Sequence, residues 1–387
     1  MRVVTVDGTP DAARELRRAL SDALNGGDTV LPVPPDVAPG GAERGVRHAL
    51  CTERPVRLAA PPTSAAVIRT SGSTGTPKDV LLSARALIAS AHATHARLGG
   101  PGHWLLATPA HYVGGLQVLV RSLLAGTEPG VLDLSDSFHP EEFAQVSKAL
   151  PANDPRYTAL VPTQLARLLD AGQAAAAASF DAIVVGGAAL PAELRQRAED
   201  HGVRVVSAYG MSETSGGCVY DGIPLDGVRV DTQYGRVRLA GQVLADGYLD
   251  DEAATAAAFR DGWFHTNDLG RVAADGRLEV LGRADDVINT GGVKVAAHAV
   301  ADALRGHPGV RDACVVGVPD TEWGEAVVAA VVPADPDRPP APDDLAAHVR
   351  TTLGSPSTPK RVRFLAELPL RGPGKPDHDA VRRMVQE

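Results

Sequence analysis

The chain has 387 residues, of which 44% are hydrophobic and 22% are charged, and its formal net charge is -9. This length exceeds what one ordinary hydrophobic core serves, so we expect two domains. The composition is that of a folded globular protein rather than a disordered one, and the negative charge argues against nucleic acid as a partner. The cysteines, Cys51, Cys218 and Cys314, show neither paired nor metal-ligand spacing, which fits a reducing cytoplasm.

The sequence gives no pattern for export or membrane insertion. Acidic side chains at Asp7, Asp11 and Glu15 interrupt any apolar core of an N-terminal signal peptide. The apolar stretch 113–125 contains Arg121 and is too short to span a bilayer. We therefore expect a cytoplasmic protein without membrane insertion.

Strand and helix patterns alternate over the first half of the chain. Residues 10–24 form an amphipathic helix pattern, with proline in its first turn and a Gly-Gly pair after it. Strands are expected at 65–68, 104–107, 159–161, 183–185 and 203–206, and further helices from Ser83 to about 98, at 116–124, from 162 onward and at 193–200. Repeated strand–helix units predict a parallel sheet covered by helices, and ligands bind at the carboxyl ends of such strands.

The pattern changes in the second half. Short strands with Gly and Asp turns between 227 and 281 predict an antiparallel β-subdomain. Beyond Asp285 a smaller α+β unit is expected, with helices at 297–304 and 345–353, strands at 313–316, 326–332 and 362–365, and a proline-rich loop at 333–342. The predicted fold class is α/β, with a large N-terminal domain, 1–284, and a small C-terminal domain, 285–387.

A loop rich in glycine, serine and threonine, 69–78, follows the first of these strands and precedes the helix that Ser83 caps. A strand, such a loop and then a helix can present backbone N–H groups and hydroxyls to phosphate oxygens. The spacing differs from the Walker pattern, because Lys78 follows Pro77 and no Ser or Thr comes after it. The alternative interpretation of the loop alone is a flexible linker.

The loop resembles the phosphate-binding signature of the acyl-adenylate-forming superfamily. Further stretches match that superfamily in the expected order: Tyr-Gly-Met-Ser-Glu-Thr at 209–214, Thr-Asn-Asp at 266–268, Gly-Arg-Ala-Asp-Asp at 282–286 and Gly-Lys at 374–375. Within the superfamily, stretches 160–165, 186–191 and 212–222 are most similar to the o-succinylbenzoate–CoA ligases of menaquinone biosynthesis. The resemblance covers most of the chain and implies an enzyme.

The implied reaction couples a carboxylic acid to a thiol at the expense of ATP. A carboxylate is a poor acyl donor, so the enzyme first makes AMP the leaving group and a thiol then attacks the mixed anhydride. ATP, Mg²⁺ and coenzyme A are the implied cofactors, and a small carboxylic acid, here o-succinylbenzoate, is the implied substrate. Such a site must bind triphosphate, neutralise charge at the α-phosphate and later admit coenzyme A.

The resemblance assigns the ATP site residue by residue. The loop and Lys78 would hold the β- and γ-phosphates, while Tyr209 would lie on adenine beside a slot of small residues. The ATP-binding set is Thr70, Ser71, Gly72, Ser73, Thr74, Gly75, Thr76, Lys78, Gly186, Gly187, Ala188, Ala208, Tyr209, Gly210, Asp268 and Arg283. Within this set, Asp268 and Arg283 would bind the ribose hydroxyls, since carboxylate and guanidinium supply complementary acceptors and donors.

Three residues carry the implied catalysis, and a fourth the implied domain motion. Ser212 would contact the α-phosphate, and Glu213 would bind Mg²⁺, a cation suited to carboxylate and phosphate oxygen. Lys375 would contact the carboxylate and α-phosphate during adenylation. Asp285 would be the hinge about which a mobile C-terminal domain turns between the two half-reactions.

The acyl-binding residues are implied by two segments that flank the same pocket in the superfamily. They are His111, Tyr112, Gly114, Met211, Ser215 and Gly216. The chain departs from the superfamily at Tyr112, which takes the usual histidine position, and at Asp79, which replaces a common glycine and could weaken ATP binding or pair with Lys78. Another aryl or fatty acid, a carrier-protein thiol as acceptor, and a catalytically silent scaffold remain alternatives, and a homodimer stays open.

Overall fold

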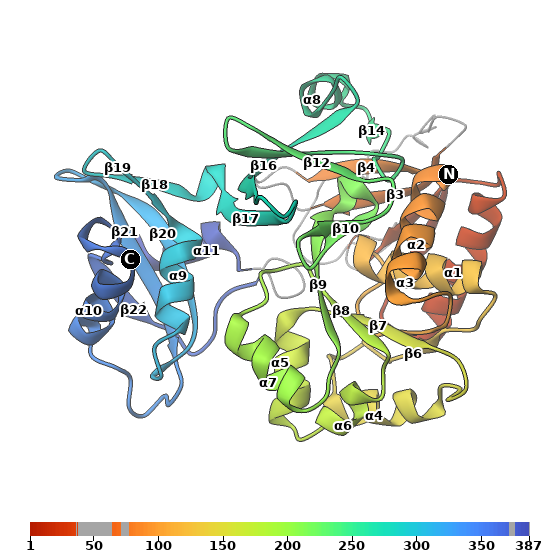
Figure 1. Cartoon of the computed structure of the whole chain (residues 1–387), viewed down its shortest axis with the longest axis horizontal. Coiled ribbons are helices and arrows are strands. Elements are labelled where there is room, and N and C mark those ends of the chain that lie inside the picture. The colour runs from red at the N-terminus through yellow and green to blue at the C-terminus, as the bar shows by residue number, and fades with distance from the viewer. Residues whose placement is uncertain (36, 38–63, 71–76, 371–375, 387) are drawn as a thin grey trace. The chain divides into compact units, whose positions relative to one another are not determined.

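The computed structural model describes residues 1–35, 37, 64–70, 77–370 and 376–386, and Figure 1 draws the rest as a grey trace. The chain divides into two compact units, residues 1–230 with 239–265 and residues 231–238 with 266–387. The division between residues 265 and 266 separates two compact units, whereas the boundary expected at Asp285 marks a hinge. The hinge boundary therefore stays a prediction.

The first sheet of the N-terminal unit contains the ends of the predicted phosphate loop. Its strand order is β1-β2-β3-β4-β14, with β1, β2 and β3 parallel and β4 antiparallel to both β3 and β14. The strands are β1 (Arg2–Thr5), β2 (Val30–Val33), β3 (Ser64–Thr70), β4 (Lys78–Ser83) and β14 (Gly247–Tyr248). Helix α1 (Pro10–Leu24) has the predicted bounds.

The expected order of strand, loop and helix around this loop is wrong in one respect. The loop joins two antiparallel strands, and helix α2 (Ala84–Leu98) begins only after β4. Strand β4 forms because the apolar run Val80, Leu81 and Leu82 is buried in the sheet. The predicted cap is confirmed, since the amide of Ala86 donates to the hydroxyl of Ser83.

The second sheet of this unit confirms the predicted parallel, helix-covered architecture (Figure 1). Its order is β11-β10-β9-β8-β7-β5-β6, parallel from β6 to β9 and antiparallel at β10 and β11. The strands are β5 (His103–Leu106), β6 (Gly130–Val131), β7 (Arg156–Leu160), β8 (Ala182–Val185), β9 (Val205–Met211), β10 (Gly216–Tyr220) and β11 (Ile223–Pro224). The associated helices are α3 (Val113–Ala125), α4 (Pro140–Ala149), α5 (Pro162–Asp170), α6 (Ala174–Ala178) and α7 (Ala192–Asp200).

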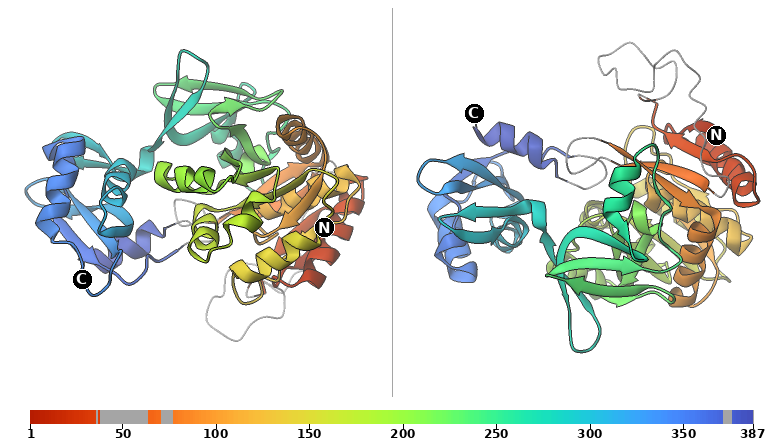
Figure 2. Two further views of the ribbon diagram at one scale, coloured as in Figure 1. Left: turned by 60° about the horizontal axis from the view of Figure 1, so that its bottom comes forward. Right: turned by 90° about the horizontal axis from the view of Figure 1, so that it is seen from above.

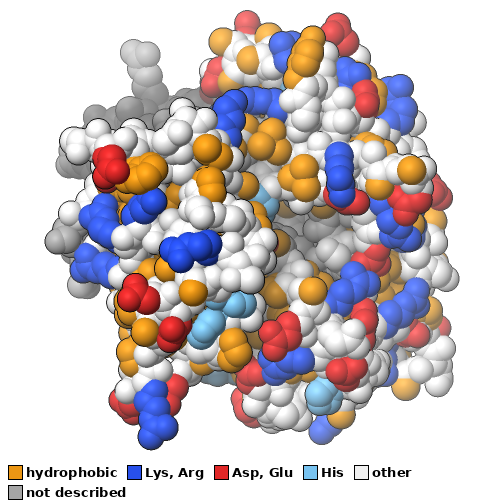
Figure 3. All heavy atoms as spheres, turned by 60° about the vertical axis from the view of Figure 1, so that its left-hand side comes forward, with side chains coloured by type: hydrophobic (Ala, Val, Ile, Leu, Met, Phe, Trp, Pro, Cys, Tyr) orange, Lys and Arg blue, Asp and Glu red, His pale blue; other side chains and the backbone are white. Residues whose placement is uncertain are grey.

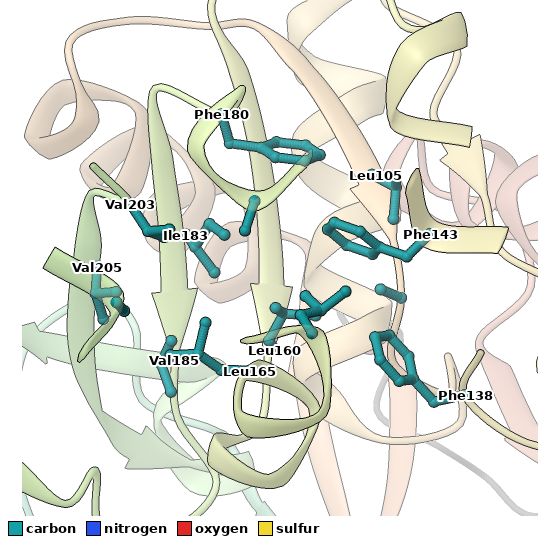
Figure 4. Close-up of a cluster of buried hydrophobic side chains, with 14 of the residues drawn as sticks. Leu105, Phe138, Phe143, Leu160, Leu165, Phe180, Ile183, Val185, Val203 and Val205 are labelled. Carbon is teal, nitrogen blue, oxygen red and sulfur yellow. The ribbon is translucent and has the colours of Figure 1, made fainter. Parts of the chain in front are cut away.

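A core of aromatic and aliphatic side chains fixes one face of this parallel sheet (Figure 4). Phe143 on α4 and Phe180 after α6 face each other with ring centroids 5.6 Å apart, and Phe143 is completely buried. Leu160 and Val185, the last residues of β7 and β8, belong to the same cluster. The core therefore holds the carboxyl ends of two neighbouring strands in fixed positions.

Helix α3 buries Arg121, the charged residue that interrupts its apolar sequence. Arg121 is only 3% exposed, and its guanidinium lies 4.8 Å from the centroid of the Trp104 ring and 3.5 Å from the Tyr220 hydroxyl. The indole of Trp104 donates to His95, whose pKa falls to about 4 because of burial and the nearby Arg121 charge. This network joins α2, α3, β5 and β10.

A third sheet corresponds to the predicted antiparallel β-subdomain. Its order is β12-β13-β16-β15, with β17 antiparallel to β16. The strands are β12 (Arg229–Gln233), β13 (Arg236–Ala240), β15 (Phe259–Arg260), β16 (Trp263–Val272) and β17 (Leu278–Arg283), and helix α8 (Glu252–Ala258) precedes β15. The pairing of β16 with β17 places Asp268 directly opposite Arg283.

The C-terminal unit contains a further sheet with helices on both faces (Figure 2). Its order is β19-β18-β21-β20, with β22 parallel to β21. Alternate residues of β20 and β21 pack against α9 and α10 on one face and against α11 on the other. The elements are β18 (Val287–Thr290), β19 (Val293–Ala296), α9 (Ala297–Arg305), β20 (Val310–Asp320), β21 (Gly324–Pro333), α10 (Pro342–Leu353), β22 (Arg361–Phe364) and α11 (His378–Gln386).

Charges of both signs are interspersed on the face shown in Figure 3, where Lys and Arg lie among Asp and Glu. Elsewhere on the described chain, charged side chains form ion pairs, such as Arg271 with Glu279 and Arg305 with Asp312. Within the described ranges, no helix is both long enough and apolar enough to cross a bilayer.

Candidate functional site

The two ends of the predicted phosphate loop lie on the paired antiparallel strands β3 and β4. Thr70 lies opposite Lys78, and its hydroxyl donates to the Lys78 carbonyl over 3.2 Å. The remaining loop positions predicted to bind phosphate are outside the described residues, as is the predicted catalytic lysine. These positions are Ser71, Gly72, Ser73, Thr74, Gly75, Thr76 and Lys375.

The acid beside the loop has a partner other than Lys78. Asp79 lies opposite Arg69 in the hairpin and accepts two hydrogen bonds from it, from Nε over 2.8 Å and from an Nη nitrogen over 2.7 Å. Hydrogen bonding to Asp79 raises the pKa of the Arg69 guanidinium. In this fork-to-carboxylate geometry the charge of Asp79 is balanced within the hairpin, so Lys78 is left for another role.

The residues predicted to contact adenine lie where β9 passes the end of β8. Tyr209, Gly210 and Met211 lie beyond the strand expected at 203–206, but they belong to β9, because β10 supplies a new antiparallel partner beyond the parallel register. Gly186, directly after β8, approaches Ala208 so closely that a Cβ there would lie 3.0 Å from the Ala208 carbonyl oxygen. The structure thus brings Gly186, which begins the small-residue turn that continues through Gly187 and Ala188, beside Ala208.

The β9–β10 turn is organised by Thr214 in the 3₁₀ helix η1 (Ser212–Thr214). The Thr214 hydroxyl lies 2.7 Å from the Gly216 carbonyl and accepts from the Met211 amide over 3.0 Å. Ser215 and Gly216 both have left-handed backbone conformations, with φ of 54° and 97°. A glycine at 216 lets the chain take this turn without steric strain.

The same turn packs on the first two turns of α3. The side-chain amide of Gln117 donates to the Ser215 carbonyl over 2.8 Å, and a Cβ on Gly216 would lie 3.5 Å from Gln117. Tyr112 is the residue before α3, and its ring lies 4.2 Å from that of His111. The two segments predicted to form the acyl pocket, 111–114 and 211–216, are therefore held together through Gln117, which the sequence did not single out.

Glu213 and Lys78 meet through a residue that the sequence did not single out either. The hydroxyl of Tyr248 donates to Oε1 of Glu213 over 2.9 Å, and the Lys78 ammonium lies 4.5 Å from the centroid of the Tyr248 ring. Burial, followed by the charge of Glu213, raises the pKa of the Tyr248 hydroxyl above its ordinary value. Tyr248 therefore keeps its proton and acts as a donor at neutral pH.

The predicted ribose ligands lie together on the paired strands β16 and β17. An Nη nitrogen of Arg283 is 3.4 Å from Oδ1 of Asp268, which is only 8% exposed. Arg283 also makes two shorter bonds to Asp285, from Nε over 2.9 Å and from its other Nη nitrogen over 2.7 Å. The sequence did not predict that the proposed hinge residue and the proposed ribose arginine would be hydrogen-bonded.

A second contact next to the predicted hinge joins it to helix α11. Nδ1 of His378 is 3.2 Å from Oδ1 of Asp286. Hydrogen bonding to Asp286 and then to Cys314 raises the pKa of His378 to about 10, so the imidazole is charged at neutral pH. Leu370 and Pro376, on either side of the segment that contains Lys375, form an antiparallel bridge.

Comparison with known proteins identifies the family. Residues 3–246 match the AMP-binding enzymes, and residues 299–375 match the C-terminal domain of AMP-binding enzymes. The chain belongs to the AMP-binding enzyme family. This agrees with the superfamily that the sequence motifs resemble.

The relatives of this AMP-binding enzyme include ligases for different acids. A Mycobacterium tuberculosis protein named "Probable 2-succinylbenzoate--CoA ligase" is 47% identical over 328 residues, which cover 84% of this chain and 85% of that protein. A sulfoacetate–CoA ligase of Cupriavidus necator is 34% identical over 395 residues, which cover 94% and 74%. The chain is accordingly an acid–CoA ligase of the AMP-binding family.

The fold of the AMP-binding enzyme also matches a solved ligase. The structure of o-succinylbenzoate CoA synthetase from Bacillus subtilis, in complex with the acyl-adenylate intermediate, superposes with a TM-score of 0.73 at 26% identity. The match covers 82% of this chain and 69% of that chain.

The residues at Glu213 fit the Mg²⁺ that the family resemblance implies. In the part of the chain that the structure describes, no group of three or more His, Cys, Asp or Glu side chains is placed to hold a metal ion. Mg²⁺ is commonly bound through one or two carboxylates, substrate phosphates and water rather than by an all-protein cage. A single carboxylate with one oxygen on Tyr248 and a second oxygen for the cation fits that mode.

Proposed function

We propose that this AMP-binding enzyme is a 2-succinylbenzoate–CoA ligase that acts in menaquinone biosynthesis. In the first step a carboxylate oxygen of the acid bonds to the α-phosphorus of ATP, and pyrophosphate leaves. In the second step the thiol of coenzyme A attacks the acyl carbon, AMP leaves, and the thiol proton is lost. The name of the Mycobacterium tuberculosis relative and the Bacillus subtilis complex support this choice of acid.

The observation that carries the proposal is the packing of the 211–216 turn on the start of α3. The bond from Gln117 to Ser215 holds the small residue Gly216 beside the helix, next to the predicted metal ligand Glu213. We infer that the aromatic ring of the acid packs along this turn, close to the α-phosphate. The acid and the triphosphate can thus be held side by side for in-line attack.

The other residues are assigned by chemistry. Thr70, Lys78 and the loop between them would hold the triphosphate, and Ser212 would contact the α-phosphate. Mg²⁺ on Glu213 would neutralise phosphate charge. Asp268 would accept hydrogen bonds from the ribose hydroxyls.

Pyrophosphate release across a panel of acids tests the proposal. The panel contains 2-succinylbenzoate, benzoate, sulfoacetate and a medium-chain fatty acid, each with and without coenzyme A. We expect 2-succinylbenzoate to give the highest kcat/KM and AMP formation to depend on coenzyme A. If another acid exceeds it by about tenfold, equivalent to about 1.4 kcal/mol, the substrate assignment is wrong. Turnover with a carrier-protein thiol in place of coenzyme A would identify a different acceptor.

A further inference from the structure

Tyr248 stands where three separate segments of the N-terminal unit meet. It lies on β14, which pairs antiparallel with β4, so that Tyr248 is opposite Val80, two residues after Lys78. The amide of Ala245 donates to the carbonyl of Glu213 over 2.9 Å. Segment 245–248 is thereby bonded through its backbone both to the strand of Lys78 and to the 3₁₀ helix of Glu213.

The side chain of Tyr248 also links these two segments, one through its hydroxyl and the other through its ring. Its hydroxyl donates to Oε1 of Glu213 over 2.9 Å, and its ring lies beneath the Lys78 ammonium, 4.5 Å away. The ring itself is fixed, because Tyr248 is 7% exposed and packs edge-on against Phe259 at 5.8 Å. One rigid side chain therefore contacts both charged groups.

Tyr248 contacts two groups of opposite charge that do not form an ion pair with each other in the described structure. Within the described part of the chain, Lys78 makes no ion pair with Glu213 or with Asp79. The aromatic face attracts the ammonium while leaving its N–H donors available to another ligand. The hydroxyl takes one lone pair of Oε1, which orients the carboxylate and leaves its other acceptor positions, including those on Oε2, for a cation.

We propose that Tyr248 is the positioning residue of the magnesium–triphosphate site. Its hydroxyl orients Glu213 for Mg²⁺, and its ring holds Lys78 for the phosphates. This inference rests on the proposed function insofar as Glu213 and Lys78 bind Mg²⁺ and ATP. It concerns nucleotide binding alone, so it can be tested without any acid or coenzyme A.

The test measures calorimetric binding of the α,β-methylene analogue of ATP as a function of Mg²⁺ concentration. Tyr248→Phe removes the hydroxyl and keeps the ring, so we expect the Mg²⁺ concentration for half-maximal enhancement to rise about 3- to 10-fold. Binding measured in EDTA should stay as in wild type. Tyr248→Leu removes the ring too, so it should also weaken binding in EDTA.

Tyr157→Phe is the matched control, because it also deletes a hydrogen-bonded hydroxyl from a buried tyrosine of the same unit. It should lower thermal stability without moving the Mg²⁺ midpoint. A Tyr248→Phe enzyme with the wild-type Mg²⁺ midpoint, or a wild-type enzyme whose nucleotide binding ignores Mg²⁺, overturns the proposal. Failure of the proposed function looks different: the wild type binds the magnesium nucleotide but makes no 2-succinylbenzoyl-CoA.

Discussion

At the scale of single residues, Asp268 is the most buried of the predicted ATP ligands that the structure describes. It is 8% exposed, it lies opposite Arg283 in the β16–β17 ladder, and its amide donates to the Thr266 hydroxyl over 3.0 Å. The Thr266 hydroxyl in turn lies 2.8 Å from the Val237 carbonyl. A carboxylate held this firmly can accept hydrogen bonds from a ligand without reorganising.

Asp268→Ala should therefore raise the KM for ATP and impair both half-reactions, because the ribose is held throughout. Loss of a charge-assisted hydrogen bond should cost on the order of 1.5–3 kcal/mol of binding free energy. Asp231→Ala is the control, since Asp231 also pairs with an arginine, Arg238, and has no assigned role. If the Asp268 variant has the same KM for ATP as the wild type, the role of Asp268 is purely structural.

Residue types and motifs predicted which side chains matter, but not which partners they have. The sequence left open whether Asp79 weakens ATP binding or pairs with Lys78. In the structure it is hydrogen-bonded to Arg69 instead. That outcome depends on the antiparallel register of β3 and β4, which a single sequence does not specify. Tyr248 and Gln117 were not predicted as site residues because their contacts in the site join residues far apart in the chain.

At the scale of elements, the link between the 3₁₀ helix η2 (Ala284–Asp286) and α11 is sensitive to pH. His378 has a pKa of about 10 in the folded protein, against an ordinary value of 6.5, because of its hydrogen bond to Asp286. The charged imidazole therefore stabilises the folded state fully below pH 6.5, and this contribution is lost as the pH rises through about 10.

We expect the free energy of urea unfolding of the C-terminal unit to fall between about pH 6.5 and 10 in the wild type. The fall should be shallower in His378→Gln, and Asp286→Asn should flatten it as well. An NMR titration of the His378 ring measures the pKa directly, and a wild-type value near 6.5 would show that the ion pair contributes nothing.

Long, periodic elements were predictable, whereas short strands that need a distant partner were not. Helices α1 and α10 and strands β20 and β21 follow the expected patterns, because their apolar residues recur at helical or strand spacing. The hairpin of β18 and β19 was missed, as it is only four residues a strand and gains its apolar contacts from α9. Strand β4 was missed because a helix N-cap follows it directly.

At the scale of the whole molecule, the predicted division into two domains concerns how one active site could serve two reactions. The chain has two compact units, and the proposed hinge Asp285 lies within the described residues, exposed and bonded to Arg283. A group needed only for adenylation could be carried toward the α-phosphate in one orientation and removed in the other. Substitutions at Lys375 and at Asp285 should therefore impair opposite half-reactions.

Lys375→Ala should slow formation of the acyl-adenylate by about 10²–10³-fold, the scale of losing one preorganised electrostatic group. Supplied with synthetic acyl-adenylate, the same variant should still transfer the acyl group to coenzyme A at nearly the wild-type rate. Single-turnover assays of each half-reaction measure both rates. If Lys375→Ala harms both halves equally, the lysine is not specific to adenylation.

Asp285→Pro should do the reverse, because proline fixes φ at position 285 and restricts the residue before it. Adenylation should be spared and thioester formation blocked, since only the second step requires rotation about this position. The substitution also removes the carboxylate that binds Arg283, so Asp285→Ala is the matched control. The alanine variant loses the same bonds but keeps backbone freedom, and it should perform both half-reactions. Thioester formation by Asp285→Pro at the rate of Asp285→Ala would place the pivot elsewhere in the chain.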